Sequence, residues 1–527
     1  MSLQEKPMVQ KGKKGLLHVL FGRTSVIMIP ILVQVGLLGW VIDYFNRVVP
    51  YFFGGHLLIG LVVSLWIINQ PNNPTIKLSW VMLLMFSPVI GGLLYLYVKT
   101  HPGQRILEKR LEHMYQQTKQ YVSQNAEVRE ALEVRSKATA RLSDYVRKFG
   151  NYQIYQNTDV TYFPLGEDKF AAMLTELEKA EKFIFLEYFI IEKSYMWDEI
   201  LKILERKVSE GVEVRLMYDG TCAFHYLPYR YPEEMEEKGI QCKMFSPLRP
   251  FLSTHYNNRD HRKILVIDGK VGFTGGVNIG DEYINRRAPF GHWKDTALML
   301  KGDAVEGLTQ MFLQMWNVTE RREEQYQKYL LPKQNDNTQN TQNTQGGFVM
   351  PFADSPFDQE QVGETVYMDI INRAVDYVHI MTPYLILDNE MVTALTYAAK
   401  RGVDVKLILP HIPDKKMPFA LARSHYPQLL KAGVKIYEYT PGFVHAKVFC
   451  SDANTAVVGT INLDYRSLYL HFECGAFLFD LPMIQEIEAD FQTTLEKCEQ
   501  ITIKTYHMMP IFQKIMGKAL RILAPLM

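Results

Sequence analysis

The sequence predicts an α/β protein with two repeats, each a β-sheet flanked by helices, packed as a pseudo-twofold pair behind an N-terminal α-helical membrane region. Three observations predict this class. One motif occurs twice, as HRKILVIDGKVGFTGGVN from His261 and as HAKVFCSDANTAVVGTIN from His445. A strand–helix–strand pattern precedes each copy, with AEKFIFLEYFII before GVEVRLMYD and AVDYVHIMTPYLIL before GVDVKLILP. Apolar residues concentrate near the amino end.

The amino-terminal part divides into a basic segment, residues 1–24, and a hydrophobic membrane region, residues 25–98, with two or three helices. Segments 25–42, 51–68 and 80–98 are each long enough to cross a hydrocarbon core of ~30 Å, although buried helices of a soluble domain are the alternative. Basic residues flank the region on both sides, so the positive-inside rule places both flanks in the cytoplasm, which three full crossings forbid. Segment 25–42 contains Pro30 and Gln34 and is the weakest span. We expect a multi-pass membrane protein with a cytoplasmic catalytic region, and the number of crossings stays open.

The remaining elements follow in order. Residues 99–150 are charged with a narrow apolar stripe, which predicts a connecting helix. The first repeat covers residues 151–332 and the second covers 349–505, and the polar low-complexity run 333–348 links them. Residues 506–527 predict an amphipathic helix with Lys514, Lys518 and Arg521 on one face, which suits an anionic lipid surface; an ordinary docking helix is the alternative.

Charge and cysteine content exclude several classes of protein. Lys and Arg number 58 against 57 Asp and Glu, so no global basic field indicates a nucleic-acid partner. The five cysteines form no C-x-x-C pair and are odd in number. They predict reduced thiols in a cytoplasmic compartment, not a disulfide framework or a zinc site.

The duplicated motif carries the chemistry. Each copy has His, then Lys two, Asp seven, Gly fourteen and Asn seventeen residues later. Strand alternation puts the His and Lys on one face, and a turn returns the Asn beside them. The two sets are His261, Lys263 and Asn278, and His445, Lys447 and Asn462. Facing each other, they suit a phosphoryl group: one neutral His attacks phosphorus and one protonated His gives the leaving oxygen its proton. No metal or other cofactor is required, because the Lys and Asn groups supply the charge.

A different role is expected for the two motif aspartates. Asp268 and Asp452 belong to the motif and are therefore among the catalytic candidates. Their strand parity is wrong for sharing a face with the His and Lys, however. Parity favours a structural role, in which they hold the turn or a nearby cation.

The paired motifs resemble those of the phospholipase D superfamily, and the closer resemblance is to the bacterial cardiolipin synthases. It is carried by GVKIYEYTPGFVHAKVFCSDANTAVVGTINLDYRSLYLHFE, by MTPYLILDNEM and by WVMLLMFSPVIGGLLYLYV. The resemblance implies two phospholipase D-like repeats that meet at one active site in a bacterial membrane enzyme. It implies a phosphohistidine intermediate with His261 as nucleophile and His445 as general acid. It also implies that Asp295 and Glu473 each bond the His of the other repeat, which fixes the tautomer.

The implied enzyme is a phosphatidyltransferase that makes cardiolipin and glycerol from two phosphatidylglycerol molecules. Its partners are then phosphatidylglycerol and anionic membrane lipid, with no nucleic acid. A membrane-bound phospholipase D that releases phosphatidic acid uses the same residues, so only the product separates the two. A superfamily nuclease and a catalytically dead membrane scaffold are further alternatives. Acyl-chain preference, other phosphatidyl donors and oligomeric state are not predicted.

Overall fold

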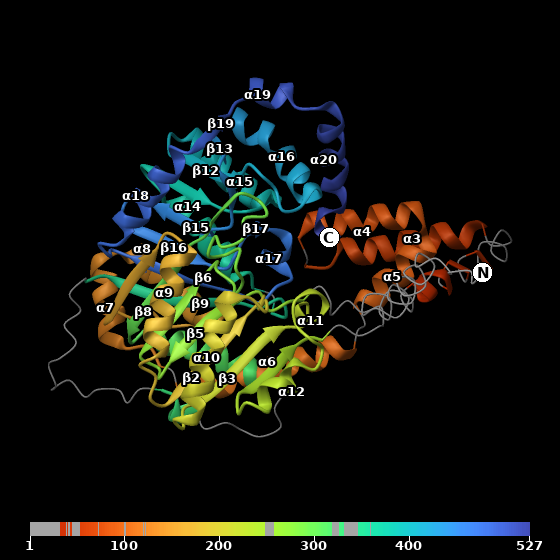
Figure 1. Ribbon diagram of the computed structural model, residues 1–527. Helices are drawn as coiled ribbons and strands as arrows, with labels where there is room; N and C mark the ends of the chain where they lie inside the picture. Colours follow the sequence, from red (N-terminus) through yellow and green to blue (C-terminus); the bar gives the residue numbers. More distant parts are fainter. Residues whose placement is uncertain are drawn as a thin grey trace, which may run out of the picture.

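The computed structural model describes residues 32–37, 39–40, 43–44, 53–71, 73–99, 102–119, 121, 123–247, 258–318, 326–330, 346–358 and 360–526 (Figure 1). The basic segment 1–24, most of segment 25–42 and residues 333–345 of the polar linker lie outside the described residues. Predictions made for them stay predictions.

The first repeat is a seven-stranded mixed sheet in the order β1-β8-β6-β5-β2-β3-β4. Strands β2, β3 and β4 run parallel, and the other neighbours pair antiparallel. The strands are β1 (Thr158–Phe163), β2 (Phe183–Tyr188), β3 (Glu213–Asp219), β4 (Gln241–Phe245), β5 (Lys263–Ile267), β6 (Val271–Gly275) and β8 (Ala297–Gly302). The helices are α9 (Gly166–Leu177), α10 (Tyr195–Ser209), α11 (Cys222–His225), α12 (Tyr231–Glu236) and α13 (Val305–Asn317), followed by the 3-10 turn η4 (Tyr326–Lys328).

The second repeat has an eight-stranded sheet in the order β19-β13-β12-β10-β15-β16-β18-β9. Apart from the added edge strand β19, this is the strand order of the first sheet, so the duplication extends from motif to topology. The strands are β9 (Phe348–Asp354), β10 (Tyr377–Met381), β12 (Asp404–Pro410), β13 (Lys435–Tyr439), β15 (Val448–Ser451), β16 (Thr455–Gly459), β18 (Glu473–Phe479) and β19 (Cys498–Ile501). The helices are α14 (Val362–Arg373), α15 (Asn389–Lys400), α16 (Lys416–Lys431), α17 (Tyr465–Tyr469) and α18 (Ile484–Leu495).

The two repeats share a core. One hydrophobic cluster includes Phe185 of β2, Phe312 of α13 and Phe352 of β9, so it runs from one sheet through α13 to the other. A second cluster, with Met173 of α9 and Trp197 of α10, covers the opposite face of the first sheet. The predicted α/β architecture, two similar repeats that each have a sheet flanked by helices, is therefore present.

Short strand pairs join the repeats where the motifs begin. Strand β7 (His292–Lys294) of the first repeat pairs in parallel with β14 (Gly442–Val444) of the second. Asp260, just before the first motif, forms a parallel bridge with Phe472. Within the second repeat, β11 (Leu385–Ile386) pairs with β17 (Leu463–Asp464). Each motif histidine therefore follows a stretch that is fixed to the other repeat.

The N-terminal helices α3 (Phe53–Ile68), α4 (Pro74–Phe86) and α5 (Pro88–Lys99) pack together and extend from the side of the second repeat (Figure 1). Segment 80–98 was expected as one span, but it is divided at Ser87, because Pro88 lacks a backbone N–H and begins a new helix. Within the described residues, no helix combines the length and apolar content that crossing a bilayer requires. The membrane region thus stays a prediction.

The connecting segment also differs from the expected single helix. Residues 99–150 form α6 (Pro102–Lys119), α7 (Ala126–Arg135), α8 (Lys137–Tyr145) and the π-helical turn η2 (Val146–Gly150). New helices start where Asn125 and Ser136 cap the following backbone N–H groups with their side chains. The narrow apolar stripe therefore did not indicate one continuous helix, and that prediction was wrong.

The carboxyl-terminal region is α19 (Ile503–Met508), α20 (Ile511–Leu523) and the 3-10 turn η5 (Ala524–Leu526), with the break at Pro510. Helix α20 packs on α16 through Gly517, where an added Cβ would lie 2.3 Å from the carbonyl oxygen of Ala420. Leu520 and Ala524 are buried on this side, whereas Ile511 and Phe512 are exposed. The helix therefore docks on the protein and still presents an apolar face.

Candidate active site

The two motif histidines occupy equivalent, buried positions at the junction of the repeats. The backbone N–H of His261 donates to the carbonyl of Phe472 at 2.9 Å, and that of His445 donates to the carbonyl of Lys294 at 2.7 Å. Phe472 and Lys294 each immediately precede an acidic residue, Glu473 or Asp295. The cross-repeat strand pairing therefore brings one carboxylate to each histidine.

Each imidazole contacts the carboxylate of the other repeat. Nδ1 of His445 lies 2.6 Å from Oδ2 of Asp295, and Nδ1 of His261 lies 3.0 Å from both oxygens of Glu473. These are the two pairings that the family resemblance implied. A carboxylate at Nδ1 assigns the proton of the neutral ring to that atom, so Nε2 of each histidine keeps its lone pair.

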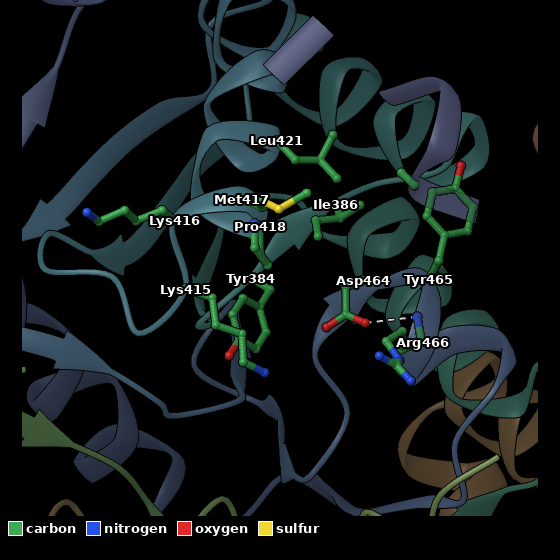
Figure 2. Close-up of a pocket in the computed structure, with 11 residues that line it drawn as sticks. Tyr384, Ile386, Lys415, Lys416, Met417, Pro418, Leu421, Asp464, Tyr465 and Arg466 are labelled. Carbon is green, nitrogen blue, oxygen red and sulfur yellow. Dashed lines mark hydrogen bonds between the residues drawn. The ribbon is translucent and has the colours of Figure 1, made fainter. Parts of the chain in front are cut away.

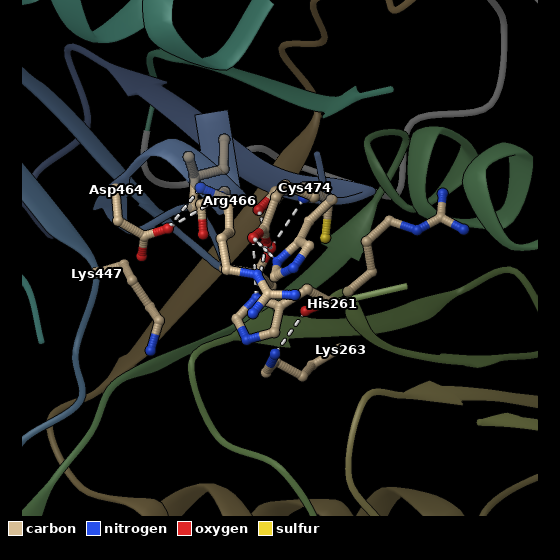
Figure 3. A network of polar contacts seen from close by, with 12 residues as sticks. His261, Lys263, Lys447, Asp464, Arg466 and Cys474 are labelled. Carbon is tan, nitrogen blue, oxygen red and sulfur yellow. Dashed lines mark hydrogen bonds and ion pairs between the residues drawn. The ribbon is translucent and has the colours of Figure 1, made fainter. Parts of the chain in front are cut away.

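The motif lysines repeat the same geometry. Both are buried, and Nζ of each donates to the backbone carbonyl of the histidine in its own motif. Figure 3 shows the bond of Lys263. Burial lowers the pKa of Lys263 to about 8 and that of Lys447 to about 7, although Glu473 and Asp295 oppose the shift. The site therefore holds two ammonium groups whose charge is sensitive to pH near neutrality.

The histidine pKa values are also lowered. Burial, together with the neighbouring lysines, holds the pKa of His261 well below its usual value and lowers the pKa of His445 to about 4. Both rings are therefore neutral at pH 7 in the free enzyme. This state suits a nucleophile, whereas a general acid needs an added proton, which a bound anion favours.

The two motif asparagines differ. Asn278 accepts a hydrogen bond from the backbone N–H of Ile190 at 3.1 Å and donates to the Tyr283 hydroxyl at 3.0 Å, so its amide is already used inside the protein. Within the described part of the chain, the buried Oδ1 of Asn462 has no hydrogen-bond partner. Asn278 is thus a supporting residue, and Asn462 is the stronger candidate for a substrate contact.

The motif aspartates lie in the turns after β5 and β15 and have positive φ angles, 55° at Asp268 and 51° at Asp452. The Asp268 carboxylate accepts three backbone N–H groups, from residues 181–183, and the Asp452 carboxylate accepts three from residues 375–377. Each therefore ties its turn to the start of the neighbouring strand, as strand parity favoured. We remove Asp268 and Asp452 from the catalytic candidates.

The fold adds two residues that sequence reasoning missed. The ring of His471 lies 5.5 Å from that of His261, and neither of its nitrogens has a hydrogen-bond partner among the described residues. Burial lowers the pKa of His471 to about 4, and Nδ1 is 3.7 Å from Glu473, beyond hydrogen-bond distance. Arg466 is the second, because it belongs to the polar network around His261 (Figure 3). The available signal was the spacing H-x-E, which parallels W-x-D at Trp293 in the first repeat.

One set of side chains could hold a metal ion. Ligand atoms of His261, His471 and Glu473 all lie within 4.8 Å of one another. Two imidazoles and a carboxylate are donors that Zn²⁺ accepts. The prediction from linear spacing missed this set, since its members come from both repeats. A metal here would engage His261 itself.

Comparisons with known proteins agree with this geometry. The family described as "Cardiolipin synthase, PLD-like domain" matches residues 173–316 and 367–495, and "Phospholipase_D-nuclease N-terminal" matches residues 58–99. A protein of Streptococcus mutans is 49% identical over 89% of this chain and 100% of its own length. A cardiolipin synthase of Alkalihalophilus pseudofirmus is 34% identical over 89% of this chain and 92% of its own. The phosphatidylserine synthase structure of Haemophilus influenzae has a TM-score of 0.53 at 14% identity, covering 73% of this chain and 98% of that one, so that likeness is one of fold.

Proposed function

Since this chain belongs to the cardiolipin synthases of the phospholipase D superfamily and is a phospholipid phosphatidyltransferase, we propose that it makes cardiolipin and glycerol from two phosphatidylglycerol molecules. The observation that carries the proposal is the pair of buried histidines, each bonded at Nδ1 to a carboxylate of the other repeat. This arrangement leaves Nε2 of each histidine with its lone pair, and a double-displacement reaction needs one such atom as nucleophile and one for proton transfer.

In the first half-reaction, Nε2 of His261 attacks the phosphorus of the donor phosphatidylglycerol. The bond between phosphorus and the oxygen of the terminal glycerol breaks, and His445 gives that oxygen its proton. Glycerol leaves, and phosphatidyl-His261 remains. Glu473 stabilises the charge that develops on the His261 ring, and Lys263 and Lys447 donate to the non-bridging oxygens.

His445 becomes protonated when the donor lipid binds. In the free enzyme, burial and the charge of Lys447 lower the pKa of His445 to about 4. The phosphodiester carries a negative charge, which offsets the lysine charges and raises the proton affinity of the nearby ring. Donor binding therefore takes up a proton, and Asp295 stabilises the imidazolium that results.

In the second half-reaction, His445 is neutral and removes the proton from the terminal glycerol hydroxyl of a second phosphatidylglycerol. The resulting oxygen attacks phosphorus, the bond from phosphorus to Nε2 of His261 breaks, and cardiolipin leaves. His261 is again neutral and His445 again carries a proton, so the atoms and charges balance over the cycle.

We further propose that the reaction takes place at a bacterial cell membrane, with the catalytic repeats on the cytoplasmic side. Support comes from the apolar side chains that α3, α4 and α5 expose, among them Leu58, Leu61, Leu65, Met85 and Phe86. Exposed apolar surface of this extent is typical of membrane or protein contact.

The test is to incubate the purified protein with phosphatidylglycerol vesicles, without added metal, and to identify the products. We expect cardiolipin and glycerol in equal amounts. Phosphatidic acid with glycerol in its place would indicate a phospholipase D. Absence of any lipid product would favour the scaffold alternative, and cleavage of added DNA would favour a nuclease.

A further inference from the structure

A cavity of about 530 Å³ lies in the second repeat, between the start of α16, the β11–β17 pair and the turn η5 (Figure 2). Its walls are largely apolar, with Ile386, Met417, Pro418, Leu421 and Tyr465. Its volume is within the range of pockets that hold small organic ligands.

Two basic side chains, Lys415 and Arg466, border this cavity, whereas the side chain of Lys416 extends away from it (Figure 2). Lys415 and Arg466 are exposed, and neither forms an ion pair within the described part of the chain. An apolar cavity with two unpaired cations fits a ligand that is both apolar and anionic.

One end of the cavity adjoins the phosphoryl site. Asp464 and Arg466 line the cavity and also belong to the polar network around His261 and Lys447 (Figures 2 and 3). Oδ1 of Asp464 accepts the backbone N–H of Arg466 at 2.9 Å, which fixes the start of α17. Arg466 therefore stands between the cavity and the reacting groups.

The other end is bordered by Ala524 of η5, directly after α20. There Ser79 of α4 donates through its hydroxyl to the carbonyl of Ile522 at 2.7 Å, so the apolar N-terminal helices are attached at this point. A ligand in the cavity thus spans from the phosphoryl site toward the apolar helices.

We propose that this cavity binds the acceptor lipid, an anionic phosphoglycerolipid with a free glycerol hydroxyl. Its intact phosphate lies at Lys415 and Arg466, and an acyl chain lies along the apolar wall. This inference rests on the proposed function. During the second half-reaction Lys263 and Lys447 hold the phosphoryl group on His261, so the acceptor phosphate needs cations of its own.

The consequence is a choice between lipid and water. If the acceptor is bound poorly, water attacks phosphatidyl-His261 instead: the bond from phosphorus to nitrogen breaks, His445 takes the water proton, and phosphatidic acid leaves. Weakening the cavity should therefore change the products and spare the first half-reaction.

The decisive variant is K415Q in the full chain. We expect the ratio of cardiolipin to phosphatidic acid to fall about fivefold, because one cation that faces the lipid phosphate is lost. The single-turnover burst of glycerol should stay within about twofold of wild type, since His261 and His445 are untouched. M417W, which narrows the cavity, should shift the ratio in the same direction. The matched control is K400Q, an exposed lysine at the carboxyl end of α15.

Binding separates this inference from the proposed function. We expect H261A to bind dihexanoyl phosphatidylglycerol, and H261A/K415Q to bind it about fivefold more weakly. Dihexanoyl phosphatidylcholine and inorganic phosphate should each bind poorly, since one lacks net charge and the other lacks acyl chains. Charge-dependent binding without any cardiolipin synthesis by wild type would overturn the function and leave the lipid site. Normal synthesis with K415Q equal to its control, in both product ratio and binding, would overturn the site.

Discussion

The two repeats build the two halves of one site with the same strand order but different side chains around the histidine. Glu473 at His261 also accepts a hydrogen bond from the hydroxyl of Thr460. Thr460 lies fifteen residues after His445, and the equivalent position, fifteen residues after His261, is Gly276. An added Cβ at Gly276 would lie 2.0 Å from Oδ1 of Asp295. The glutamate Glu473 with its neighbour Thr460 therefore corresponds to the shorter aspartate Asp295 with its neighbour Gly276.

The ring environments differ as well. His445 is surrounded by Trp293 and Phe443, at centroid distances of 5.2 and 5.9 Å. His261 has His471 at 5.5 Å and Phe189 at 4.8 Å. Duplication therefore preserved the histidine–carboxylate contact, while the neighbours diverged. This difference is consistent with unequal roles, since one histidine would carry the phosphatidyl group and the other only a proton.

The largest effect is expected from the histidines themselves. H261A should abolish turnover and the covalent intermediate, because it removes the nucleophile. H445N should slow glycerol release by about 10²–10⁴-fold, because it removes only the general acid. Rapid-quench trapping with labelled phosphatidylglycerol measures both.

A donor with a good leaving group sharpens the contrast. Phosphatidyl-p-nitrophenol needs no general acid, so H445N should still form the intermediate from it and H261A should not. Trapping of the phosphatidyl group on His445 in wild type would reverse the two roles.

The carboxylates should come next. D295N and E473Q should each reduce kcat by about 10²–10⁴-fold, because the tautomer and the imidazolium lose their support. G276A should resemble D295N, since its Cβ displaces the Asp295 carboxylate. T460A removes one hydrogen bond and should cost much less, and T460S is its control. Circular dichroism and thermal unfolding check that each variant is folded; a T460A loss as large as that of G276A would argue that the halves are equivalent.

Metal ions test only the half of the site that contains His261 and His471. EDTA should leave the chemical step nearly unchanged, because lysines and amides supply the charge in the proposed mechanism. Added Zn²⁺ should inhibit, by binding His261, His471 and Glu473. H471N should lower the Zn²⁺ affinity by about tenfold or more, whereas W293F, at the equivalent position, should not. Loss of activity on chelation, restored by one divalent ion, would contradict the metal-free mechanism.

The pH dependence of kcat/KM tests the two motif lysines, Lys263 from the first repeat and Lys447 from the second. Burial lowers the pKa of Lys447 to about 7 and that of Lys263 to about 8, and an ammonium is charged only below its pKa. The free enzyme therefore loses positive charge as the pH rises through this window, and kcat/KM for phosphatidylglycerol should fall between about pH 7 and 9. A profile of kcat/KM in mixed micelles measures it. A rise over the same window would show that a deprotonation, not a lysine charge, limits binding.

Much of this organisation was readable from the sequence, because local spacing determined it. The strand–turn–strand pattern after each motif histidine predicted β5–β6 and β15–β16, and strand parity indicated the turn role of Asp268 and Asp452. Pro88 and Pro510 also indicated helix breaks, but the prediction of continuous helices considered only the length of the apolar pattern. The H-x-E spacing marks His471, but the sequence does not place it or Arg466 beside His261, because the Asp260–Phe472 bridge between distant segments brings them to the site.

The smallest effect is expected outside both halves, at α20. Its packed side, with Gly517, Leu520 and Ala524, holds it on α16, so K514Q/K518Q/R521Q should leave the fold and membrane fractionation unchanged. Basic residues gain about 1 kcal/mol each near an anionic surface, so the triple variant should lower activity on anionic vesicles severalfold. Because that attraction is screened by salt, wild-type activity should fall as salt rises and the variant should respond less. Vesicle assays over a range of salt concentrations measure this, and identical salt responses would show that α20 serves only to pack on the protein.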